Sequence, residues 1–90
     1  VILTDADWRE FIQFFNKVYP SFFSSIKQKY PKLSKAELRF CCLSYLSLSD
    51  KEMSAMLGVG RASIRVTRGR TRAKLQLTAT DSLEELLSVV

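Results

Sequence analysis

The 90-residue sequence contains no histidine, and it has only two cysteines, three glycines and two prolines. Without histidine, Cys41 and Cys42 are the only soft ligands, so one chain cannot assemble a tetrahedral zinc site. The commonest general base is also missing, and neither a glycine-rich phosphate loop nor a nucleophile motif occurs. We therefore expect no metal, no cofactor and no enzymatic activity.

Long apolar runs are absent too, because no stretch approaches the roughly 18 residues that a membrane helix needs. We therefore expect no membrane partner. The adjacent cysteines lie in the apolar segment 38–43, where buried thiols in a reducing compartment are favoured over a disulfide. This interpretation predicts a cytoplasmic protein. Since the chain begins with Val1 rather than methionine, we also expect it to be cut from a longer polypeptide.

Positive charge is what the sequence has in excess, with 14 lysines and arginines against 9 acidic residues. Residues 61–75 contain no acidic residue and hold six of the basic ones, namely Arg61, Arg65, Arg68, Arg70, Arg72 and Lys74. A helix face exposed only to water usually mixes charges of both signs, whereas this segment repels itself unless a polyanion screens it. The pattern favours a nucleic-acid partner, with a solvated helix face as the alternative.

Hydrophobic periodicity predicts an all-α chain without strands. The first helix is expected over residues 5–19, with Asp5 or Asp7 as its N-cap. A second helix is expected to hold Pro20 in its first turn and to end before Pro31. The aromatic side chains of both segments follow the helical period, which favours core packing over a base-stacking platform.

A capping box of Ser34 and Glu37 predicts a third helix over residues 35–46. Apolar side chains fall on two opposite sides of this helix, so we expect it to have neighbours on both. One side carries Leu38, Cys41, Cys42 and Tyr45, and the other carries Ala36, Phe40 and Leu43.

Two further helices are separated by only three residues. Ser49 predicts the start of a short helix over residues 50–57, and Gly58-Val59-Gly60 ends it. The basic helix over residues 61–75 follows directly, so the pair must meet at a sharp angle, as in a helix-turn-helix.

A last helix is expected to open at Asp81 or Ser82. One of its faces carries Leu83, Leu86, Leu87 and Val90. This face has two interpretations, a contact with a second copy of the chain or a part of the intramolecular core, and both remain open.

Residues 33–75 resemble the LuxR/GerE-type helix-turn-helix DNA-binding domain, a four-helix relative of sigma factor region 4. The matching segments are Leu33-Ser34 with Glu37, Lys51-Glu52-Met53-Ser54, Ser63-Ile64-Arg65 and Lys74-Leu75. The resemblance implies a small helical bundle with this helix-turn-helix, preceded by two aromatic-rich helices. Residues 1–32 would form an N-terminal helical extension that packs on or connects to the DNA-binding domain, residues 33–90, as one cooperative unit.

Two segments preceding the match, 18–23 and 30–34, resemble the approach to this domain in bacterial regulators that carry tetratricopeptide repeats. The resemblance implies an upstream sensor or repeat domain in the same polypeptide. The sequence departs from the family pattern at Ser54, where alanine is usual, and at Thr71, where a large aliphatic residue is common.

We therefore expect residues 61–75 to enter the major groove of double-stranded DNA. The expected base-reading residues are Arg65 first, then Arg61, Val66 and Arg68, although the stem of Arg68 leans toward the packed side. Ser63 and Thr67 are suited to base or phosphate, and Thr67 equally to inward packing. The expected phosphate contacts are Lys51, Arg70, Arg72 and Lys74, of which Lys51 is equally an ordinary surface lysine.

Because one short helix gives modest specificity, we expect a homodimer on paired half-sites. Neutralising six to eight phosphates predicts a slope of log affinity against log salt of roughly −5 to −7. Two alternatives remain open: region 4 of a sigma-like factor acting with RNA polymerase, and a protein-interaction module whose basic helix docks on an acidic partner.

Overall fold

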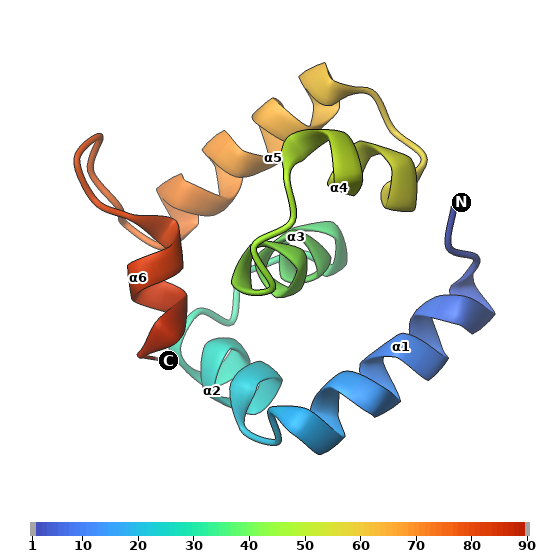
Figure 1. Ribbon diagram of the computed structural model, residues 1–90. Coiled ribbons are helices and arrows are strands. Elements are labelled where there is room, and N and C mark those ends of the chain that lie inside the picture. The colour runs from blue at the N-terminus through green and yellow to red at the C-terminus, as the bar shows by residue number, and fades with distance from the viewer. Residues whose placement is uncertain (1, 90) are drawn as a thin grey trace.

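The computed structural model describes residues 2–89, which form six helices and no strand. The helices are α1 (Asp5–Val18), α2 (Phe22–Lys29), α3 (Lys35–Tyr45), α4 (Asp50–Leu57), α5 (Arg61–Lys74) and α6 (Leu83–Ser88). In Figure 1, α3 lies in the middle of the molecule and the other helices surround it. The predicted all-α architecture is confirmed.

Two helix starts follow the sequence patterns closely. At α3 the Ser34 hydroxyl accepts from the Glu37 N–H at 3.2 Å, and the Glu37 carboxylate accepts from the Ser34 N–H at 2.7 Å. Ser49 and Glu52 form the same reciprocal pair at α4. Each box satisfies backbone N–H groups that have no partner inside the helix. The predicted starts of both helices are confirmed.

The starts of the first two helices differ from prediction. The N-cap of α1 is Thr4, and Asp7 is its partner three residues on, so neither Asp5 nor Asp7 is the cap. Helix α2 begins at Phe22 after the N-cap Ser21, so Pro20 lies in the connecting turn rather than in the first helical turn. Ser21 caps α2 without a side-chain hydrogen bond.

One buried cluster joins the N-terminal helices to the rest of the chain. Trp8, Phe15 and Phe22 of the first two helices belong to the same core as Phe40 of α3. Within residues 2–89 the other buried apolar members are Ile26, Leu33, Cys41, Cys42, Leu43, Met53, Ile64, Leu75, Leu83 and Leu87. Residues 5–29 therefore share one core with α3 and the C-terminal helices.

The middle of α3 is buried on both sides, as its pattern predicted. Cys41 and Cys42 are free thiols without exposed surface, and burial raises the pKa of each to about 12. Both thiols therefore stay protonated and unreactive at neutral pH. Ala36 is exposed, contrary to the expectation, because burial on its side of α3 begins one turn later, at Phe40.

The connection between α4 and α5 is a three-residue turn. Gly58 ends α4 in the left-handed conformation, with φ 68°, which glycine adopts at little cost. The Ser54 hydroxyl donates to the Val59 carbonyl oxygen across this turn. Ser54 therefore has a structural use at this position.

Thr71 is the polar residue at the centre of the inward face of α5. Its side chain is 0% exposed, and its Oγ1 has no hydrogen-bond partner within the described part of the chain. An unpaired buried hydroxyl destabilises the folded state because it has lost its hydrogen bond to water.

Thr71→Val is therefore expected to raise the free energy of unfolding by about 1 kcal/mol, because it removes the hydroxyl and keeps the shape. Thr67→Val, the same change one turn earlier at a half-buried position, is the matched control and should change stability little. Urea unfolding of both variants measures the difference. A less stable Thr71→Val protein would contradict the assignment of an unsatisfied hydroxyl.

Candidate nucleic-acid interface

The N-terminal half of α5 presents an exposed face that is basic and apolar at once. Arg61, Ser63 and Arg65 are exposed, and Val66 is 52% exposed. Gly69 lies on the same outward side, and a Cβ added there would meet no atom within 4 Å. The side chains that were expected to contact base edges are therefore accessible on this half of the helix.

Arg68 differs from these residues because it is half-buried and paired within the chain. Its guanidinium donates two hydrogen bonds to the carboxylate of Asp50, one of them at 3.0 Å, and forms an ion pair with it. The Cζ atom of Arg68 also lies 5.4 Å from the ring centroid of Phe40. Arg68 therefore clamps α5 to the start of α4, and its expected base-reading role competes with this clamp.

The ion pair between Arg68 and Asp50 also changes the pKa of Asp50. The hydrogen bond from Arg68 is the main cause that lowers the pKa of Asp50, and the charges of Arg65 and Arg61 lower it further. Asp50 thus stays ionised at neutral pH. Sequence reasoning missed this residue as a partner of α5, because the two members of the pair lie 18 positions apart.

Arg72 is engaged with the segment that leads to α6. Its Nη2 donates to the carbonyl oxygens of Thr78 at 2.6 Å and Asp81 at 2.8 Å. The Asp81 carboxylate in turn accepts hydrogen bonds from the Thr78 N–H and hydroxyl, so hydrogen bonds within this loop also hold its shape. Arg72 was expected to contact a phosphate, but its guanidinium binds the chain's own backbone instead.

Lys74 is held at the other end of α5 by a buried carboxylate. Its Nζ donates to Glu37 Oε1 at 2.7 Å and to the Lys32 carbonyl oxygen at 3.1 Å. Burial alone would raise the pKa of Glu37, but hydrogen bonds from Lys74 and Ser34 outweigh burial and lower it. Lys74 was also expected to contact a phosphate, but its ammonium group binds Glu37 and the Lys32 carbonyl oxygen of the same chain.

Four basic side chains of the expected site remain free. Lys51, Arg61, Arg65 and Arg70 are exposed, and none forms an ion pair within residues 2–89. Thr67 is half-buried on the side of α5 that faces its neighbours. The structure therefore divides the predicted set into cations that are available to a ligand and cations that hold α5 in place.

The leucine face of α6 belongs mainly to the core. Leu83 is 3% exposed and Leu87 is 1% exposed, and Leu86 is half-buried against the same cluster. Val90, the fourth residue expected on this face, lies outside the described residues. Because their side chains are covered by this chain, Leu83 and Leu87 offer no surface to a second copy.

Lys74→Met is expected to lower the free energy of unfolding at pH 7 by about 1.5 kcal/mol, because it leaves the buried Glu37 without its cation. The lowered pKa of Glu37 means that its contribution is present at neutral pH and is lost as pH falls through the folded-state value. The difference in free energy of unfolding between the unsubstituted protein and Lys74→Met should therefore narrow below about pH 4. Urea unfolding of both proteins at pH 7 and pH 3 measures this difference.

Arg70→Met is the matched control, because Arg70 is exposed and makes no ion pair within residues 2–89. It should change stability little at either pH. Equal destabilisation by the two substitutions would contradict the structural role of Lys74.

The described part of the chain contains no group of three or more histidine, cysteine or acidic side chains placed to hold a metal ion. None of its helices is long and apolar enough to cross a membrane. No protein-family model, curated protein or solved structure matches this chain, so its own residues carry the inference of function.

Proposed function

We propose that this chain binds double-stranded DNA in a sequence-specific manner, as the effector domain of a bacterial transcriptional regulator, with α5 in the major groove. The observation that carries the proposal is the exposed N-terminal half of α5. It combines Arg61, Arg65 and Val66 on an accessible face of a helix that has no acidic residue. The resemblance of residues 33–75 to the LuxR/GerE-type domain supports the same role.

Each exposed residue has a role that its chemistry favours. Arg61 and Arg65 can each donate two hydrogen bonds to guanine, and Val66 can contact a thymine methyl group. Ser63 can donate to a base or to a phosphate. Lys51 and Arg70 are suited to phosphates on either side of the groove. Arg68, Arg72 and Lys74 then act indirectly, by holding α5 at the angle that the groove requires.

Small side chains along the outer face of α5 favour close approach to DNA. Ala62, Gly69 and Ala73 are all exposed on this helix. A helix whose outward strip lacks long side chains can lie deep in a groove about 12 Å wide, while arginines on its flanks reach outward. Gly69 has no neighbour in the fold that requires glycine, so close approach to a ligand is a use that fits its position.

Selection of bound duplexes from a random DNA library tests the proposal. The 90-residue chain is expected to enrich a defined motif, and a symmetric motif would support the expected dimer on paired half-sites. Arg65→Ala should change the preferred base at one position of each half-site, because a bidentate contact discriminates by about 1–3 kcal/mol.

Arg9→Ala is the matched control for the selection, because it removes the same charge from an exposed position on α1. It should leave the motif unchanged. Salt-sensitive binding without any motif would contradict sequence reading. The absence of binding would instead favour the protein-interaction module.

The salt dependence of binding should be weaker than the sequence alone predicted. At most four free basic residues, Lys51, Arg61, Arg65 and Arg70, can neutralise phosphates, against the six to eight phosphate contacts assumed from composition. We expect a slope of log affinity against log salt no steeper than about −4 for one domain on DNA. Titrations at several salt concentrations measure the slope, and a value near zero would contradict DNA binding.

A further inference from the structure

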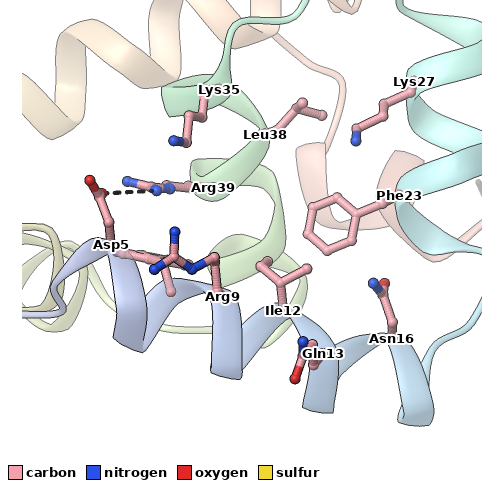
Figure 2. A pocket seen from close by; sticks show the side chains of 11 residues that line it. Asp5, Arg9, Ile12, Gln13, Asn16, Phe23, Lys27, Lys35, Leu38 and Arg39 are labelled. Carbon is pink, nitrogen blue, oxygen red and sulfur yellow. Dashed lines mark ion pairs between the residues drawn. The ribbon is translucent and has the colours of Figure 1, made fainter.

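A second surface of the molecule has the features of a small-molecule site. A hollow of about 500 Å³ lies where α1, α2 and α3 meet. In Figure 1, α1 and α2 lie on the far side of α3 from α5. Trp8, Ile12, Phe23 and Leu38 supply apolar lining, and Figure 2 shows Ile12, Phe23 and Leu38 converging on the hollow from three helices.

The rim of this hollow is strongly cationic. Arg9, Lys27, Lys35 and Arg39 line it, against the single carboxylate of Asp5. Asp5 pairs with Arg39 at 3.7 Å, and the Arg39 guanidinium lies 4.8 Å from the ring centroid of Trp8. Figure 2 shows this pair on one side of the hollow.

The other three cations of the rim lack a carboxylate partner within residues 2–89. Arg9, Lys27 and Lys35 are exposed and form no ion pair within the part of the chain that the structure describes. Figure 2 shows Lys27 of α2 and Lys35 of α3 on either side of Leu38. The amide side chains of Gln13 and Asn16 add hydrogen-bonding groups from α1. An apolar floor under unpaired cations attracts a ligand that is both apolar and negatively charged.

We propose that this hollow binds a small organic anion with an apolar body, of the class of medium-chain carboxylates. The volume lies within the range of roughly 300–1,000 Å³ that is typical of small-molecule pockets. The hydrocarbon body packs on Phe23, Leu38 and Ile12, and the carboxylate lies among the rim cations. Because the hollow and α5 are separate surfaces, this proposal does not depend on DNA binding.

Trp8 supplies a reporter for the test, because it is the single tryptophan of the chain and lines the hollow. The intact 90-residue chain is titrated with decanoate at neutral pH and without DNA, while Trp8 fluorescence is recorded. Saturable binding in the millimolar range or tighter is expected. Decanol and decyltrimethylammonium have the same hydrocarbon chain without the negative charge, so both should bind at least about tenfold more weakly.

A pair of double variants locates the site. Lys27→Gln with Lys35→Gln should weaken decanoate binding by about tenfold or more, because each lysine loses a charge-assisted interaction with the carboxylate. Lys17→Gln with Lys29→Gln removes the same charge from exposed positions outside the hollow and should leave affinity unchanged. Circular dichroism confirms that both variants remain folded.

Three results would overturn the proposal. The first is the absence of a saturable change in Trp8 fluorescence with decanoate. The second is binding of decanol or decyltrimethylammonium as tight as that of decanoate, which would show that the cations do not select an anion. The third is an equal loss of decanoate affinity in the two double variants. That result would show that affinity depends on the net charge of the protein and not on the lysines of this hollow.

Discussion

Burial of α3 on both sides is the constraint on which the rest of the structure depends. Phe40, Cys41, Cys42 and Leu43 have no exposed surface, so the middle turns of this helix offer no face to water. A helix of this kind is stable only when neighbours cover it. The aromatic N-terminal helices and the C-terminal half of the chain supply that cover, as Figure 1 shows. The basic helix and the cationic hollow therefore occupy separate surfaces around one shared helix.

The positive charge of α5 serves two physical purposes. Arg68, Arg72 and Lys74 are bound by a carboxylate on α4, by backbone carbonyls before α6 and by the buried Glu37 of α3. These three attachments fix the helix against three different parts of the fold. Arg61, Arg65 and Arg70 are exposed, form no ion pair within the described residues, and raise the local positive potential. A helix that reads DNA needs both properties, because its side chains must be accessible while its axis is held.

Much of the fold could be predicted because its signals are local. Capping boxes join residues three positions apart, and helical periodicity repeats within two turns, so α3 and α4 were located closely. The errors at Asp5, Asp7 and Pro20 are of one to three residues. Those at Asp5 and Asp7 arise because several polar residues near a helix start can all serve as caps. Most of the candidate interface was predictable as a basic segment, since six of its cations lie within residues 61–75.

The sequence by itself determined the helices to within a few residues at their ends, which of them is apolar on two sides, and where positive charge accumulates. Only the tertiary structure decided which of those charges are free. The partners of Arg68 and Lys74 lie 18 and 37 positions away, so no local pattern reveals them. The same holds for Leu83 and Leu87, whose apolar face fitted a core and a dimer contact equally well until the fold covered it. Long-range packing selects among partners that local sequence leaves equivalent, because burial and ion pairing depend on what the folded chain brings within a few ångströms.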